Sequence, residues 1–282
     1  MKSALRIGEW IQLVFIGLLG LGAWFRPLEA GRRKHVTLLA LAATAAIAAA
    51  RFSGRWMSPL SSSVVRDWIP AATMLVPYWQ VGQFFTASNP ALEARLAHFD
   101  SAFFRRVGIE PARAKISVAA ATYLQLAYLM DYPLVPLALV VLYTIRLRSK
   151  VDFYWLVVLV ATYVCFGLTL FIRALPPRML PGYEKFQVPS TRIGALNRVL
   201  LDRFSIQAIT CPSAHVASSL AAALVLLRLE PWAGAIFLCL ALSIAAATII
   251  GGYHYVADVL SAMGIALIVF AMTSCIYALN RL

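Results

Sequence analysis

The sequence predicts an all-α, polytopic transmembrane helical bundle of about eight or nine membrane segments. Hydrophobic residues make up 61% of the 282-residue chain and charged residues only 13%, whereas a soluble domain of this size carries about 25% charged residues. Apolar runs long enough for membrane helices recur along the chain,. This composition excludes a water-soluble fold, a disordered chain and a disulfide-stapled domain.

The apolar runs define the candidate membrane segments in chain order. Seven of them are candidate single helices: Trp10–Phe25, Val36–Ala50, Ile69–Phe85, Val151–Arg173, Ser213–Leu229, Trp232–Ile250 and Tyr255–Tyr277. The remaining stretch, Ile116–Ile145, fits either one long helix kinked near Asp131 and Pro133 or two short helices, because proline breaks the helical hydrogen-bond ladder. The first run follows a basic start and has no clean small-residue cleavage site after it, so we expect a retained signal anchor.

Two polar stretches complete the predicted organisation. Residues 86–113 place apolar side chains at roughly helical spacing between charges, which fits either an interfacial amphipathic helix or an ordinary solvated helix. Residues 174–212 contain no span and carry several arginines. We therefore divide the chain into N-terminal transmembrane helices, 1–91, and a membrane core, 92–282, with the interfacial helix and an active-site loop at 174–212.

The net charge of +13, from 25 basic and 12 acidic residues, would indicate a nucleic-acid partner in a soluble protein. Here the basic residues lie mainly between apolar runs, where they serve membrane topology, anionic lipids or phosphate groups. We therefore expect the lipid bilayer as a partner and no nucleic acid. The four cysteines lie far apart and form no CxxC pair, so the sequence supports neither a zinc site nor a disulfide framework.

The chemistry is expected at two histidines that stand at the starts of apolar helices. Ser213 is a natural N-cap, which places His215 in a first turn whose free N–H groups suit an anion such as phosphate. His254 and Asp258 are four residues apart, so one helical turn places them on one face. A carboxylate there can fix the tautomer of the imidazole and stabilise its cation.

Topology predicts that the two histidines meet at one membrane surface. The runs Ser213–Leu229 and Trp232–Ile250 contain 17 and 19 residues, which at 1.5 Å per residue gives lengths of about 26 and 28 Å. The chain crosses and returns, so His215 and His254 emerge together, and the arginines of the loop lie on the same side. This set of groups suits phosphoryl transfer. The alternative is that both histidines are interfacial helix caps without a catalytic role.

At these residues the sequence resembles the type 2 phosphatidic acid phosphatase superfamily, whose members share a six-helix core. The second motif of that family, Pro-Ser-Gly-His at a helix start, is matched by residues 212–215, and its third motif, His-x-x-x-Asp, by His254 and Asp258. Its basic first motif is loosely matched by residues 173–178. The resemblance runs from about Leu92 to the end of the chain.

The resemblance implies a metal-independent lipid phosphatase or phosphotransferase that needs no cofactor and acts on a membrane lipid phosphate. It implies that His254 is the nucleophile that becomes a phosphohistidine, or else the base that activates an acceptor hydroxyl, and that Asp258 orients it. His215 would protonate the leaving alkoxide and then deprotonate the incoming water or alcohol. The phosphate-binding residues implied are Arg178, Arg173 and Ser213.

One departure from the family pattern narrows the resemblance. The phosphatases of the family carry Ser-Arg six to seven residues before the third-motif histidine, whereas this sequence has Ala247 and Thr248 there. The branch that resembles inositol phosphorylceramide synthases also lacks that arginine. The sequence is therefore nearest that branch, which implies transfer of a phosphate-containing headgroup.

The sequence predicts the side of the membrane on which the active site lies and leaves the role of Asp131 and two rival functions open. The basic turn at residues 146–150 lies across the membrane from the histidines, so the positive-inside rule predicts an extracytoplasmic active site in a plasma (inner) membrane. Asp131 lies in an apolar run, where it either marks function or reaches water or caps a helix at the break. The rival functions are a transporter for an anionic lipid or solute and a non-catalytic relative of the same fold.

Overall fold

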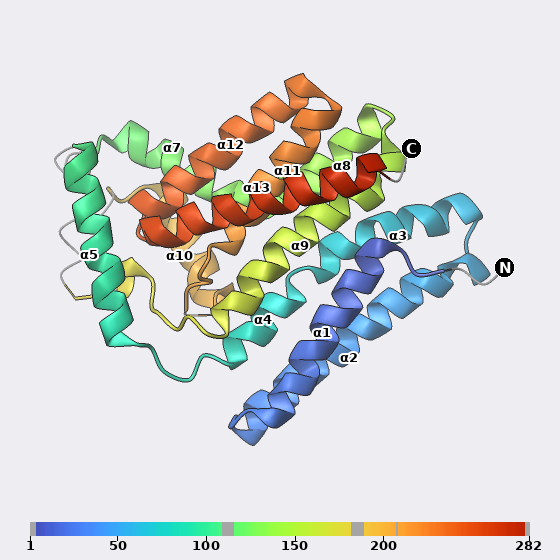
Figure 1. Ribbon diagram of the computed structural model, residues 1–282, viewed down its shortest axis with the longest axis horizontal. Helices are drawn as coiled ribbons and strands as arrows, with labels where there is room; N and C mark the ends of the chain where they lie inside the picture. The colour runs from blue at the N-terminus through green and yellow to red at the C-terminus, as the bar shows by residue number, and fades with distance from the viewer. Residues whose placement is uncertain (1–3, 109–115, 182–188, 207, 280–282) are drawn as a thin grey trace.

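The computed structural model describes residues 4–108, 116–181, 189–206 and 208–279, and all regular elements in these ranges are helices, as the predicted all-α class requires. The elements, with η marking a 3-10 helix, are α1 (Ile7–Phe25), α2 (Ala30–Phe52), η1 (Ser53–Arg55), α3 (Pro59–Thr73), α4 (Val76–Gln83), α5 (Pro90–Val107), α7 (Val118–Leu129), α8 (Asp131–Thr144), η2 (Arg148–Lys150), α9 (Val151–Thr169), η3 (Pro177–Met179), α10 (Arg192–Phe204), α11 (Ala214–Leu229), α12 (Pro231–Ile250) and α13 (Val256–Leu279). The long helices pack side by side, and α5 stands across one end of the bundle (Figure 1).

Helix α9 is the centre of the bundle and packs against α1, α11 and α13. Its large side chains Tyr154 and Trp155 are buried within the main hydrophobic core. Burial of a polar group costs free energy unless it finds a hydrogen-bond partner, and both residues have one. The Tyr154 hydroxyl donates to the carbonyl of Val135 at 2.6 Å, and the Trp155 indole N–H donates to the carbonyl of Asp67 at 2.8 Å.

Two buried glutamines join the N-terminal helices α1–α4 to one another. The amide of Gln12 in α1 donates to the carbonyl of Pro70 at 3.1 Å and accepts from the Thr73 hydroxyl at 2.9 Å, both in α3. The amide of Gln80 in α4 donates to the carbonyl of Val36 in α2 at 3.2 Å. These contacts place α4 firmly against the helices that precede it.

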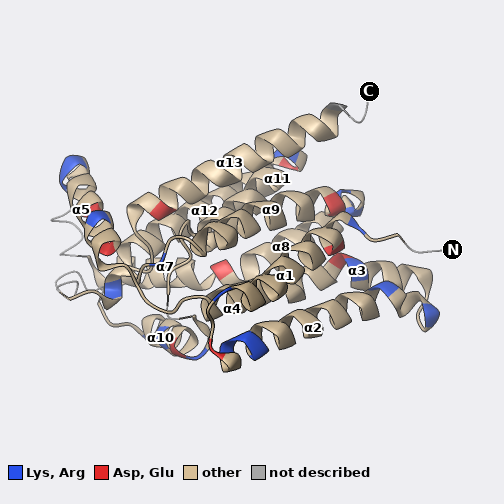
Figure 2. Cartoon of the chain, turned by 60° about the horizontal axis from the view of Figure 1, so that its bottom comes forward, with Lys and Arg blue, Asp and Glu red and all other residues tan. Residues whose placement is uncertain are grey.

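A charged network lies at the end of the bundle where α9 begins. Asp67 accepts hydrogen bonds from Arg6, from Arg148 at 2.6 Å and from the Tyr143 hydroxyl at 2.5 Å. At the other end of α9, the Thr169 hydroxyl accepts from the backbone N–H of Cys211 at 3.0 Å. Lys, Arg, Asp and Glu gather mostly at these two ends (Figure 2), and the basic η2 therefore lies at the opposite end of α9 from the residues that precede His215.

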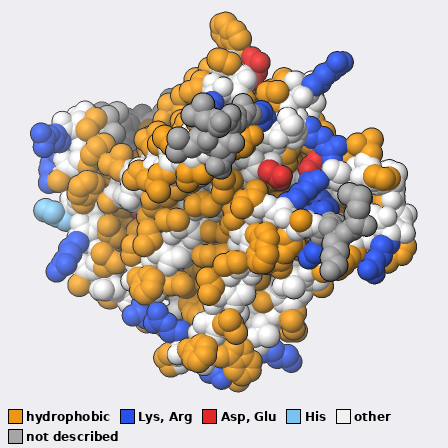
Figure 3. Space-filling view, turned by 45° about the vertical axis from the view of Figure 1, so that its right-hand side comes forward, with side chains coloured by type: hydrophobic (Ala, Val, Ile, Leu, Met, Phe, Trp, Pro, Cys, Tyr) orange, Lys and Arg blue, Asp and Glu red, His pale blue; other side chains and the backbone are white. Residues whose placement is uncertain are grey.

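The number of membrane segments is smaller than the sequence predicts. Five helical stretches are long and apolar enough to cross a membrane, namely Ile7–Phe25, Ala30–Arg55, Arg148–Thr169, Pro231–Ile250 and Val256–Ala278. The pair α7 and α8, bent by 60°, counts as a sixth if it is one broken span. The prediction of eight or nine segments is therefore not supported. A broad hydrophobic surface flanked by basic groups is visible in Figure 3, as expected for helices that face lipid.

Prolines and helix length account for the difference. The predicted span Ile69–Phe85 is divided between α3 and α4, and α3 ends at Thr73, four residues before Pro77, because a proline ring clashes with the carbonyl four residues earlier,. By the same rule α7 ends at Leu129, four residues before Pro133, so the break falls where the sequence places it. Helix α11 has only 16 residues, or about 24 Å, and falls short of a full span.

Candidate active site

The amino end of α11 has the cap that the sequence predicts. The Ser213 hydroxyl accepts from the backbone N–H of Val216 at 3.4 Å, and the Thr210 hydroxyl accepts from that of Ala214 at 3.1 Å. These bonds satisfy two of the free N–H groups at a helix start and place His215 in the first turn. Ser213 itself is completely buried, and its role in phosphate binding stays a prediction.

His254 lies in the tight turn between α12 and α13. Gly252 adopts a positive φ of 66°, which costs glycine little and allows the chain to reverse. The backbone N–H of His254 then donates to the carbonyl of Thr248 at 3.1 Å. The imidazole Nδ1 lies 3.1 Å from Oδ2 of Asp258, one helical turn further on, and both side chains are buried. The predicted pairing of this histidine with this carboxyl group is present.

The two histidines meet, as the topology argument predicts. Their ring centroids are 5.8 Å apart and their planes are 74° to each other. The His215 side chain is 26% exposed, whereas that of His254 is 5% exposed. The pair is therefore reachable from outside at His215, while His254 is held deeper in the protein.

The sequence left the role of Asp131 open, and the structure pairs it with His215. Its Oδ2 contacts Nδ1 of His215, and its carboxyl group is buried at the start of α8, where α7 and α8 bend. The signal available in the sequence was an ionisable residue within an apolar run. Its partner could not be read there, because the contact joins positions 84 residues apart. Each histidine thus has its own carboxyl group, from a different part of the chain.

Arg178 is held over the His254 turn by its backbone and its side chain. Its N–H donates to the carbonyl of Gly252 at 3.0 Å, and its guanidinium carbon lies 4.9 Å from the ring centroid of Tyr253, a cation–π contact. Tyr253 in turn stacks on Tyr128, with centroids 3.9 Å apart. Arg173, the other predicted phosphate ligand, is exposed.

Helix α5 supports the site from outside the bundle through two buried acids. Oδ1 of Asp100 accepts from the backbone N–H of Val256, two residues after His254, at 2.9 Å, and Oε1 of Glu93 accepts from that of Leu175 at 2.8 Å. The predicted active-site loop also contains a helix, α10, that was not predicted. Residues 182–188 and 207 of the loop lie outside the described residues.

The charge state of His254 follows from its surroundings. Burial, together with the neighbouring charges of His215 and Arg178, lowers its pKa well below the ordinary histidine value of 6.5,. The ring is therefore neutral at pH 7 and keeps a free lone pair on one nitrogen. Thr248, at the position where the resembling phosphatases have arginine, is buried and donates to the carbonyl of Ala245 at 2.8 Å. Among the described residues no group of three or more His, Cys, Asp or Glu could hold a metal ion.

The apolar helices, with two carboxyl-paired histidines at one end of the bundle, fit a membrane protein of the phosphatase type. Residues 102–272, more than half of the chain, match the PAP2 superfamily. The chain therefore belongs to the PAP2 superfamily, whose members are typically phosphatases or phosphotransferases. No curated protein and no solved structure matches the chain. Helices α1–α4 lie outside the matched region.

Proposed function

We propose that the protein is an integral membrane, metal-independent phosphatase or phosphotransferase that acts on a phospholipid or an isoprenyl phosphate. The observation that carries the proposal is the 5.8 Å separation of the His215 and His254 rings, each in contact with its own carboxyl group. Two imidazoles at this separation suit one phosphoryl group held between them, with one as the nucleophile and the other as the acid.

In the first step His254 attacks phosphorus. Its Nδ1 is engaged with Asp258, so Nε2 provides the lone pair, and the carboxylate stabilises the positive charge that develops on the ring. The bond from phosphorus to the alcohol oxygen breaks, and the electron pair leaves with that oxygen. His215, with Nδ1 engaged by Asp131, gives its Nε2 proton to the leaving oxygen.

In the second step the phosphohistidine is resolved. The oxygen of a water or an alcohol attacks phosphorus, its proton passes to Nε2 of His215, and the phosphorus–nitrogen bond breaks so that its electron pair returns to His254. Arg178 binds phosphate oxygens in both steps, because a planar guanidinium donates two parallel hydrogen bonds to such a group. Arg173 and Ser213 complete the proposed phosphate-binding set.

Transfer to an alcohol is the form of the reaction that we favour, as in the branch resembling inositol phosphorylceramide synthases. Thr248 favours this form, because it is uncharged and buried, and its carbonyl accepts from the N–H of His254. Arg178 then stands in for the arginine that the phosphatases carry at that position. We place the active site on the extracytoplasmic side of the plasma (inner) membrane, because the basic η2 lies at the other end of α9 and positive residues favour the cytoplasm.

The test is turnover of a lipid panel by the detergent-purified protein in EDTA. The panel contains phosphatidate, an isoprenyl diphosphate, phosphatidylglycerol phosphate and a phosphosphingolipid, each with and without an alcohol acceptor, and both free phosphate and new headgroup lipid are scored. We expect His254→Ala to lower turnover by about 10³-fold or more and His35→Ala, on the exposed side of α2, to leave it unchanged. A His254→Ala protein as active as its parent, or a parent that yields neither product, overturns the proposal.

A further inference from the structure

A cavity opens beside His215, and none of the proposed phosphate-binding residues lines it. Apart from His215 and Asp131, most of its lining is apolar, and the side chains that matter here are Met74, Leu75, Val135, Phe166, Leu201 and Phe204. They belong to the α3–α4 junction and to α8, α9 and α10. Among the described residues that line it, His254, Asp258 and Arg178 are absent. The cavity is therefore a compartment for something other than the phosphate.

His215 forms the boundary between this cavity and the other histidine. It lines the cavity and its ring also lies 5.8 Å from that of His254. In phosphoryl transfer the group that His215 protonates is the alcohol oxygen, which must lie on the far side of phosphorus from the attacking nitrogen. The carbon chain attached to that oxygen then extends from His215 into the cavity.

Asp131 provides a second, independent indication of a ligand. Asp131 lines the cavity, and its Oδ1 is buried and has no hydrogen-bond partner among the described residues, although Oδ2 contacts His215. A buried acceptor without a donor is costly. A hydroxyl group in the cavity would supply the missing donor, whereas an alkane would not.

The wall of the cavity is fixed by hydrogen bonds, and some of its apolar side chains are exposed. The indole N–H of Trp79 donates to the carbonyl of Phe204 at 3.2 Å, and the Tyr78 hydroxyl accepts from the N–H of Ile206 at 3.0 Å. These bonds tie α4 to the end of α10; Figure 1 shows the course of the two helices. Leu75 and Phe204 line the cavity and are 43% and 56% exposed, which suits entry of a ligand from the bilayer rather than from water.

We propose that this cavity binds the apolar alcohol part of the substrate, with the alcohol oxygen at His215 and its hydrocarbon chain between α4, α8 and α10. The inference rests on the proposed function and makes it more specific. The substrate is a phosphate ester of a long-chain lipid alcohol, and after the first step the same cavity admits the acceptor alcohol. The segment that precedes the family match, residues 1–101, supplies one wall through α3 and α4 and so sets the chain preference.

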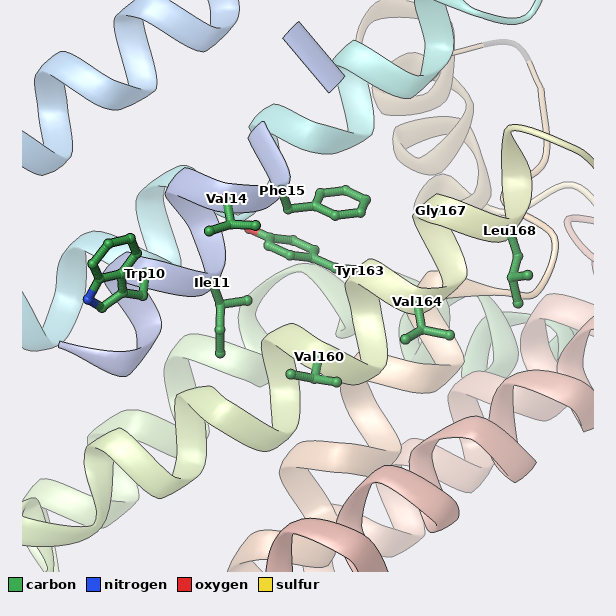
Figure 4. A pocket seen from close by; sticks show the side chains of 9 residues that line it. All are labelled: Trp10, Ile11, Val14, Phe15, Val160, Tyr163, Val164, Gly167 and Leu168. Atoms are coloured by element: carbon green, nitrogen blue, oxygen red, sulfur yellow. The ribbon is translucent and has the colours of Figure 1, made fainter. Parts of the chain in front are cut away.

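The direct test is photo-cross-linking with a long-chain alkyl phosphate that carries a terminal diazirine, added to the full-length protein in detergent micelles. We expect labelled peptides from α3–α4 and α10. A second apolar groove lies between α1 and α9 and is lined by residues such as Val14 and Val160 (Figure 4). Its lining includes neither a histidine nor a carboxylate, so labelling there reports non-specific partition of the probe. Labels confined to that groove overturn the proposal, and this outcome is independent of any variant.

A matched pair of variants tests the same point by kinetics. Ala71 lines the cavity, whereas its neighbour Ala72 on α3 is exposed and does not. Ala71→Phe should reduce labelling about tenfold and raise KM about tenfold for the long-chain substrate. For the Ala72→Phe protein, both labelling and KM should stay within twofold of the parent. Equal effects of the two variants refute the cavity assignment. Labelling needs no turnover, so a protein that is labelled as expected but inactive refutes the proposed function instead.

Discussion

Replacement of Asp258 by asparagine tests how His254 is activated. The carboxyl group and the imidazole are both buried, with Nδ1 and Oδ2 3.1 Å apart. Opposite unit charges about 4 Å apart attract by about 4 kcal/mol at an effective dielectric constant of about 20. That attraction is gained as His254 becomes cationic during attack, so the substitution removes it from the transition state and not from substrate binding.

The expected effect on rate follows from this energy. Each 1.36 kcal/mol corresponds to about tenfold in rate, so full loss of the charge interaction lowers kcat by about 10³-fold. The amide oxygen of asparagine can still accept from Nδ1, which reduces the loss to about 10²-fold. We therefore expect kcat to fall between about 10²- and 10³-fold, with KM changed less than about threefold.

The assay is phosphate release or headgroup transfer with the preferred lipid under saturating conditions. Thr273→Val is a suitable control, because Thr273 lies on the same helix and, among the described residues, its hydroxyl bonds to carbonyls of that helix alone, those of Val269 and Phe270. It should keep at least half of the parental kcat. An Asp258→Asn protein that elutes as the parent does in gel filtration and keeps kcat within threefold would refute the reasoning.

Three further predictions follow from the same site. Asp131→Asn should lower kcat about 10²-fold for lipid esters with poor leaving groups, and much less for p-nitrophenyl phosphate, whose leaving group needs little protonation; equal losses with both substrates would contradict the acid role of His215. Arg178→Lys keeps the charge but loses the planar fork and its contact with Tyr253, and should lower kcat/KM about tenfold, whereas Arg95→Lys on the exposed part of α5 should not. Because the pKa of His254 lies well below 6.5, its ring stays neutral at pH 6.5 and loses its lone pair only at lower pH. At pH 6.5, NMR of ¹⁵N-labelled imidazole should therefore show one protonated nitrogen in His254. A doubly protonated ring at pH 6.5 would be inconsistent with the structure.

The convergence of the two histidines could be predicted from the sequence, because it depends on local quantities. An N-cap at Ser213, a four-residue spacing from His254 to Asp258 and two successive helices of similar length suffice to place both rings at one end of the bundle. The break near Pro133 was equally local. These features depend on residue spacing and on local backbone chemistry, and both can be read directly from the sequence.

The contacts between distant segments could not be predicted in the same way. Asp131 finds His215 only after α7 and α8 bend by 60° and α11 packs beside them. The number of spans was overestimated because Ile69–Phe85 is apolar enough for one helix, yet it contains Pro77, which separates α3 from the short α4. Hydropathy counts apolar residues over a window, whereas a membrane span also requires an unbroken ladder of hydrogen bonds.

The two acids of α5 have a consequence for cooperativity. Glu93 and Asp100 are seven residues apart, two turns along one rigid helix, and they hold Leu175 in the loop and Val256 at the start of α13,. Because both hydrogen bonds depend on the docking of the same helix, their free energies are coupled and do not add independently. In a double-mutant cycle, loss of the second bond should therefore cost a different free energy from loss of the first, and undocking of α5 would release the loop and the catalytic turn together.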